Sequence, residues 1–106
     1  MITEQVKHDE DKFPGIDSHM MKKASLAIRC LNHYVRQKIL KTINKQSRMT
    51  VKEIYKSLDL QQAAVSQHLA LLRKAGIVSA GRVGRLVYYS INHKKVDDVK
   101  VFLAAL

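Results

Sequence analysis

Apolar residues recur at helical spacing through the first part of the chain. They form two successive sets with intervals of mostly three or four residues: Met20, Ala24, Ala27 and Leu31, then Val35, Ile39, Leu40 and Ile43. Such spacings predict two helices, the first with a seam of the coiled-coil type. Asp17 or Ser18 can cap the first helix. The polar residues 44–49 predict a loop after the second helix.

A capping signal opens the next segment. Thr50 and Glu53 form a capping box, in which each side chain bonds the backbone amide of the other residue. Residues 59–61 interrupt the short helix that follows, and a second helix is predicted over residues 62–75, with Gly76 at its end. The buried faces of these two helices are predicted to consist of Val51, Ile54 and Leu58, and of Val65, Leu69 and Leu72.

After Gly76 the apolar period changes from 3.6 to 2. Residues 77–80 and 86–91 therefore predict two strands, and residues 81–85 predict the tip of the hairpin between them. Asn92 can cap a last helix over residues 93–106. The apolar stripe of that helix consists of Val96, Val99, Phe102, Leu103 and Leu106.

The order of these elements predicts a fold. A capped helix, a three-residue turn and a second helix make a helix-turn-helix, and a hairpin directly after it makes the unit a winged helix. We therefore expect a mainly α-helical domain with a β-hairpin over residues 17–106, in the order of four helices, two strands and one helix. The polar residues 1–16 are expected to form a loose arm before it.

The charge of the chain is strongly positive and uneven. Nineteen Lys and Arg residues stand against nine Asp and Glu residues, which gives a net charge of +10. Residues 18–96 carry sixteen of the bases and two of the acids, whereas residues 1–17 carry five acids and two bases. This pattern favours nucleic acid as the partner of the middle of the chain. The alternative is a solvated basic surface that only aids solubility.

The exposed face of the helix over residues 62–75 offers small and amide side chains suited to the major groove, since Gln can pair with adenine and Ser can reach a base or a phosphate. The residues predicted to contact bases are Gln62, Ala63, Ser66 and Gln67. Those predicted to hold the DNA backbone are Lys52, Lys56, Arg73 and Lys74, and those at the hairpin tip are Arg82 and Arg85. The alternatives are a polar helix face exposed only to solvent, a surface that docks a protein partner, and DNA binding without sequence specificity.

The composition excludes other classes of protein. No stretch is long and apolar enough for a membrane span, and no signal-peptide pattern opens the chain, so we expect a cytoplasmic protein. No catalytic arrangement of nucleophile, base and acid occurs at a plausible spacing, and no phosphate-binding loop of the P-loop type is present, so we expect no enzyme. The single cysteine, Cys30, is expected to be buried and inert, with a thiol sensor or an intermolecular disulfide as the alternative.

Residues 33–106 resemble the ArsR/SmtB-type winged-helix repressors. The resemblance rests on two runs, LQQAAVSQHLALLRKAGIV over residues 60–78 and GRVGRLVYYSIN over residues 81–92. It implies a homodimer that represses a palindromic operator and that pairs through its first and last helices. The residues expected in that interface are Met20, Ala24, Ala27, Ile28, Leu31, Val96, Val99, Phe102, Leu103 and Leu106. Packing of these residues within one chain is the alternative.

The metal ligands that many members of this family use are absent from this sequence. The positions of the first usual site fall on Thr50 and Lys52, and those of the second fall near His93, Lys95 and Leu106, most of which cannot bind a metal. We therefore expect no metal site and no cofactor, and no inducer is evident. The alternative is a metal or pH-sensitive site that His19 and His93 form across the dimer interface.

Overall fold

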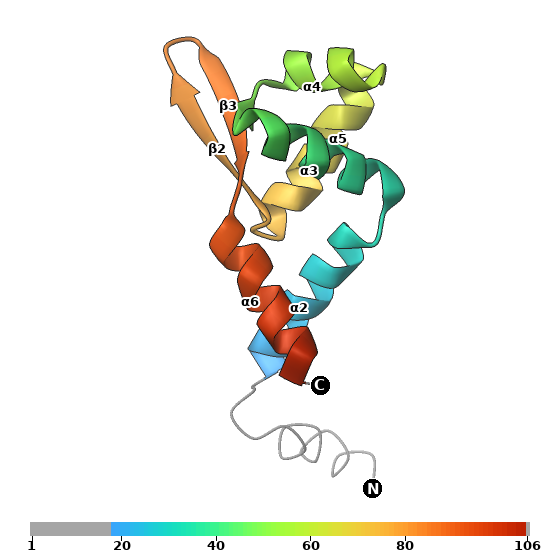
Figure 1. Ribbon diagram of the computed structural model, residues 1–106, viewed down its shortest axis with the longest axis vertical. Helices are drawn as coiled ribbons and strands as arrows, with labels where there is room; N and C mark the ends of the chain where they lie inside the picture. Colours follow the sequence, from blue (N-terminus) through green and yellow to red (C-terminus); the bar gives the residue numbers. More distant parts are fainter. Residues whose placement is uncertain (1–17, 106) are drawn as a thin grey trace, which may run out of the picture.

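The part of the chain that the structure describes contains eight elements of secondary structure. A computed structural model describes residues 18–105, the side chain of Met20 excepted. The elements are α2 (Ser18–Leu31), α3 (Tyr34–Gln46), β1 (Arg48–Met49), α4 (Val51–Leu58), α5 (Gln62–Lys74), β2 (Val78–Val83), β3 (Leu86–Ile91) and α6 (His93–Ala105) (Figure 1). The predicted arm over residues 1–16, the cap at Asp17 and the interface residue Leu106 lie outside the described residues.

The predicted fold class is confirmed, but two local predictions are wrong. Residues 44–49 are not a loop: α3 runs on to Gln46, and Arg48 and Met49 form a short strand. A strand of two residues is too short to show a period of two, so the sequence pattern could not reveal it. The first strand of the hairpin also extends through Val83, so the tip consists of Gly84 and Arg85 alone.

The strands form one antiparallel sheet in the order β1-β3-β2. Met49 lies opposite Tyr89 and Arg48 opposite Ser90, so β1 pairs with the base of the hairpin. Val83 pairs with Leu86, which leaves a two-residue turn at the far end. Gly84 has φ 64°, the positive φ that the first residue of a type II′ turn requires.

All five described helices and one face of the sheet contribute to a single core. The predicted apolar faces of α3, α4 and α5 are all represented in it, with Ile39, Ile43, Ile54, Leu69 and Leu72 fully buried. Met49 and Ile77 are buried with them and close the core from the sheet side. Burial of each such side chain contributes about 1.5–3 kcal/mol to folding. This core fixes the positions of α4 and α5.

Side-chain and backbone caps define the ends of α4 and α5. The Thr50 hydroxyl accepts from the Glu53 amide at 3.2 Å, and the Glu53 carboxylate accepts from the Thr50 amide at 2.9 Å, as predicted. At the end of α5, Gly76 has φ 78°, its amide donates to Arg73 and the Ile77 amide donates to Leu72. This pair of bonds is a Schellman motif, the predicted role of Gly76.

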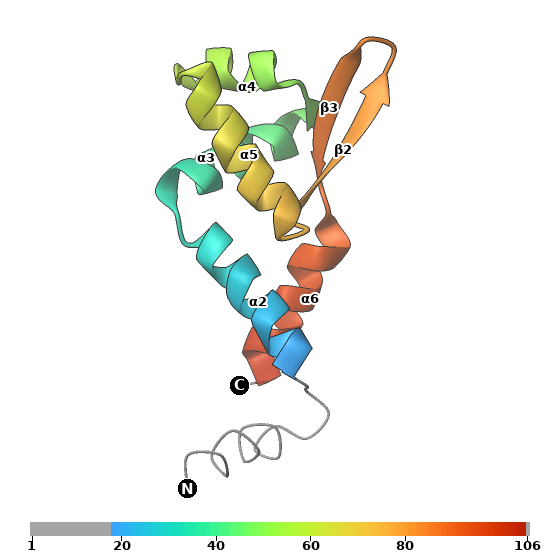
Figure 2. The ribbon, with the colours of Figure 1, turned by 180° about the vertical axis from the view of Figure 1, so that it is seen from behind.

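The molecule is elongated, with extents of 53 × 23 × 23 Å. At one end, α4, the start of α5 and the tip of the hairpin lie together, and at the other end α2 and α6 cross (Figures 1 and 2). The predicted cap of α6 is confirmed, because the Asn92 Oδ1 accepts from the Lys95 amide at 3.2 Å.

No helix among residues 18–105 is long and apolar enough to cross a membrane.

Candidate nucleic-acid interface

Helix α5 divides into the two faces that the sequence predicts. Val65, Leu69 and Leu72 point into the core. All of the residues predicted to contact DNA from this helix are exposed, namely Gln62, Ala63, Ser66, Gln67, Arg73 and Lys74. The helix contains no acidic residue, so nothing on it repels a phosphate. Figure 2 shows α5 in front of the other helices, open to approach along its length.

The start of α5 has no side-chain cap. Gln61 occupies the N-cap position with extended backbone but makes no side-chain hydrogen bond to the helix. Gln is not among the residues that favour the N-cap position, which are Ser, Thr, Asp and Asn. The amides of the first turn therefore remain free for another acceptor, and the positive end of the helix dipole favours an anion there.

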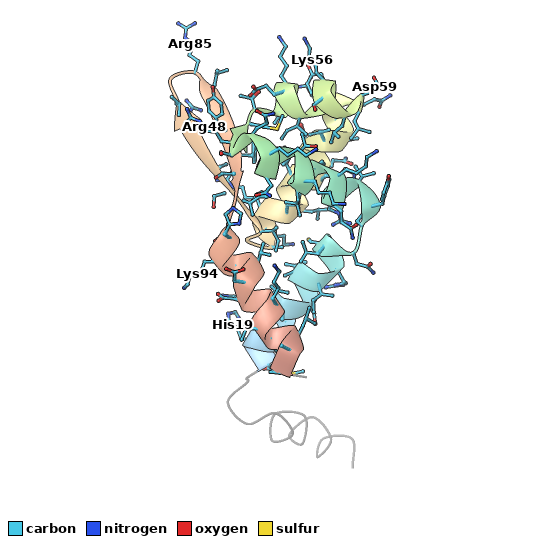
Figure 3. The ribbon with its side chains drawn as sticks, viewed as in Figure 1. His19, Arg48, Lys56, Asp59, Arg85 and Lys94 are labelled. Carbon is cyan, nitrogen blue, oxygen red and sulfur yellow. The ribbon has the colours of Figure 1, made fainter. Side chains whose placement is uncertain are left out.

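Basic side chains flank this end of α5 on two sides. Lys52 and Lys56 are exposed on α4. Lys56 projects from the same end of the molecule as Arg85 at the hairpin tip (Figure 3). Arg82 is exposed as well, but it lies within β2 and not in the tip where it was predicted. The arrangement brings cations from α4 and from the hairpin to the two sides of the α5 surface.

One basic residue of this region escaped the sequence analysis. The guanidinium of Arg48, on β1, lies over the ring of Tyr88, with its carbon 4.4 Å from the ring centroid. Such a contact is a cation–π interaction, and it ties β1 to the hairpin. Arg48 lies in the stretch that was predicted as a loop, so its position beside the hairpin had no signal in the sequence except its charge.

A histidine of α5 packs against the start of α3. The rings of His68 and His33 lie with their centroids 4.9 Å apart, and the His33 Nδ1 accepts from the Val35 amide at 3.2 Å. The His68 Nδ1 and the Arg36 Nε are both buried without a hydrogen-bond partner. Burial lowers the pKa of His68 below its usual 6.5, and the nearby His33 and Arg36 lower it further.

We expect folding stability to fall as the pH decreases below about 6.5, because the unfolded chain then takes up the proton that the folded His68 resists. The stability contributed by neutral His68 is fully present above that pH and is lost as the pH falls through the folded pKa. Urea unfolding between about pH 7.5 and 5 measures the slope. The hydrogen bonds of Glu53 to Thr50 lower its pKa below 4.5, so this carboxyl adds to the loss of stability only toward the acid end of the range.

The variant His68→Phe should flatten this pH dependence, because it keeps a ring in the packing position and removes the titrating nitrogen. The exposed His93, at the start of α6, provides the matched control, and His93→Gln should leave the slope unchanged. Equal slopes for the parent chain and His68→Phe would show that His68 is not responsible.

The described side chains predicted for a dimer interface separate into three groups by burial. Ala24, Ala27 and Val99 are buried within the chain itself. Partly buried are Ile28, Leu31, Val96 and Phe102. Leu103 is 48% exposed, and so it retains apolar surface for another chain. Val101 is 70% exposed and was not predicted, because it lies outside the stripe at spacings of three and four.

The other candidates for a sensor site are the cysteine and the metal-ligating types of side chain among the described residues. Cys30 is buried as predicted, and its Sγ lies 3.5 Å from the Leu71 carbonyl oxygen. Residues 18–105 contain no group of three or more His, Cys, Asp or Glu side chains placed to hold a metal ion.

Known proteins resemble this chain in sequence and in structure. Residues 34–80 match the family described as "Bacterial regulatory protein, arsR family". The chain is 35% identical to the transcriptional repressor PagR of Bacillus anthracis over 72 aligned residues. These residues make up 68% of this chain and 72% of PagR. The crystal structure of PagR superposes with a TM-score of 0.68 at 29% identity, over 81% of this chain and 99% of that chain.

Two other relatives agree. The arsenic resistance transcriptional regulator ArsR1 of Pseudomonas putida is 32% identical over 80 residues, which cover 76% of this chain and 62%, less than two thirds, of ArsR1. The transcriptional repressor SdpR of Bacillus subtilis is 30% identical over 70 residues, or 66% of this chain and 77% of SdpR. Together with the winged helix and its exposed basic face, these similarities show that the chain belongs to the ArsR family and is a DNA-binding transcriptional regulator, not an enzyme.

Proposed function

We propose that the protein is a homodimeric repressor that reads a palindromic operator. The observation that carries this proposal is the exposed, acid-free face of α5 with cations on both sides of it, from α4 and from the hairpin tip. Its named relatives include two transcriptional repressors. The protein would act in the cytoplasm, where a bacterial chromosome lies.

In this proposal each subunit inserts α5 into a major groove, which is about 12 Å wide and admits one helix. Gln62, Ser66 and Gln67 contact base edges, and Ala63 permits close approach. The free amides at the start of α5 and the side chains of Lys52, Lys56, Arg73 and Lys74 hold phosphates. Arg82 and Arg85 contact the flanking DNA.

The dimer would form through α2 and α6, at the end of the molecule where these helices cross. Leu103, with Phe102 beside it, supplies the exposed apolar surface, and the buried Ala24, Ala27 and Val99 support the two helices from within. Two-fold symmetry then places the half-sites about one helical turn apart, near 10 base pairs.

The test is to expose the purified protein to sheared DNA of its own genome at near-physiological salt and to sequence what stays bound. Enrichment of a few sites that share an inverted repeat is the expected result. Binding without sequence preference would overturn the base-reading roles of Gln62, Ser66 and Gln67. It would indicate a basic architectural domain or one that docks a protein.

Replacing Arg85 with alanine should weaken binding to operator and unrelated DNA alike, because a contact to the backbone carries no sequence information. The dependence of the logarithm of the binding constant on the logarithm of salt concentration should become shallower by about one. Titrations at several salt concentrations measure this slope. An unchanged slope would remove the hairpin tip from the interface.

A further inference from the structure

A small pocket lies where α2, the end of α5 and the start of α6 meet. Its volume is about 200 Å³, and each of the three elements contributes one lysine to its lining: Lys23, Lys74 and Lys95. Among the described residues, no carboxylate lines it. We propose that this lysine pocket binds the phosphate or diphosphate group of a small molecule.

The backbone around the lysine pocket is held in place. The Asn92 amide donates to the Ile77 carbonyl oxygen at 2.8 Å, which joins the end of α5 to the start of α6. A Cβ placed on Gly76 would lie 3.7 Å from carbons of the Lys95 side chain, so the stem of Lys95 packs over this glycine. Lys95 is half-buried as a result, whereas its neighbour Lys94 is exposed.

Charge and size define the chemistry of the ligand. The lining contains three lysines, so a multiply charged anion can accept charge-assisted hydrogen bonds from their ammonium groups. The volume is below the roughly 300–1,000 Å³ of pockets for drug-sized molecules, so it suits a compact anionic group. A second groove of about 470 Å³ shares Lys23 and Lys95, and it is lined by Val99 and Phe102 and by one carboxylate, Asp98. This groove lies on the face proposed for the dimer, so the proposed ligand group is assigned to the lysine pocket alone.

Binding in the lysine pocket would oppose DNA binding, and this step rests on the proposed function. Lys74 is the last residue of α5 and is assigned there to a DNA phosphate. One ammonium group cannot serve both partners fully, so an anion that draws Lys74 toward α2 and α6 weakens its contact with DNA. Thermodynamic linkage makes the effect reciprocal. The pocket would thus give this regulator an effector site that contains no metal ligand.

Inorganic diphosphate is the probe, titrated into the full chain by calorimetry in magnesium-free buffer against sodium chloride of equal ionic strength. We expect saturable binding with one diphosphate per chain. Lys95→Gln should weaken it by about tenfold, since one of three charge-assisted contacts is lost. Lys94→Gln is the matched control: it removes the same charge from the next residue, which is exposed and does not line the pocket, and should change the affinity less than about twofold.

Weak binding without saturation, or equal losses in Lys94→Gln and Lys95→Gln, would overturn the proposal. Operator affinity of the same proteins without diphosphate tests the proposed function separately. If the lysine pocket instead held a phosphate of the DNA backbone, Lys95→Gln alone would lower operator affinity and flatten its salt dependence. That result would overturn the small-molecule site and leave the proposed function standing.

Discussion

A lysine in place of Leu103 is expected to convert the proposed dimer into monomers. Leu103 is 48% exposed on α6, so the change costs the single chain little apolar burial. Across a two-fold axis the new ammonium group would face its own copy in an apolar surface, where an unpaired charge is strongly unfavourable. Loss of the second subunit removes the second half-site contact, which lowers operator affinity by about 10²- to 10⁴-fold.

Sedimentation equilibrium and operator titration measure these two effects. The control is Tyr34→Lys on α3, because Tyr34 is 71% exposed and the substitution adds the same charge away from α6. This control variant should remain dimeric and bind the operator as the parent chain does. A dimeric Leu103→Lys variant with unchanged affinity would place the interface elsewhere.

The change of Gln67 to alanine is expected to cost about 1–3 kcal/mol of operator binding, the typical value of one good contact to a base. Gln67 is exposed on α5, one turn after Ala63 and on the side away from the buried Leu69. Its amide can both donate and accept, and so it can pair with the edge of an adenine. Binding to unrelated DNA should remain unchanged, because the backbone contacts are intact.

Operators altered at one base pair at a time supply the control. The parent chain should lose affinity at the base pair that Gln67 reads, whereas Gln67→Ala should be indifferent to the same alteration, so that the two losses do not add. If the variant bound all sequences more weakly by the same factor, Gln67 would have no role in base reading.

The sequence predicts most of the helix-turn-helix because each signal there is local. Thr50 and Glu53 lie three residues apart, and α5 ends at Gly76 through the bond of its amide to Arg73 and that of the next amide to Leu72. The exposed positions of α5 follow from the spacing of Val65, Leu69 and Leu72.

Features that depend on distant parts of the chain were not predictable. Met49 is buried because the sheet pairs it with Tyr89, forty residues later, and no pattern within β1 shows this. His33 and His68 meet because α3 packs against α5. The lysine pocket likewise joins residues from three elements, and the sequence shows Lys23, Lys74 and Lys95 only as separate basic positions.

The contact of Arg48 with Tyr88 bears on how the proposed dimer would choose its operator. It joins the hairpin at Tyr88 to β1, which lies between α3 and α4 along the chain, so the contact restrains the hairpin relative to the helices. In the proposed complex, DNA must bring its flanking backbone to the hairpin tip to gain the contact with Arg85. Some sequences bend toward it at little cost, whereas stiff ones do not. Affinity then depends on the flexibility of base pairs that no side chain of this protein touches.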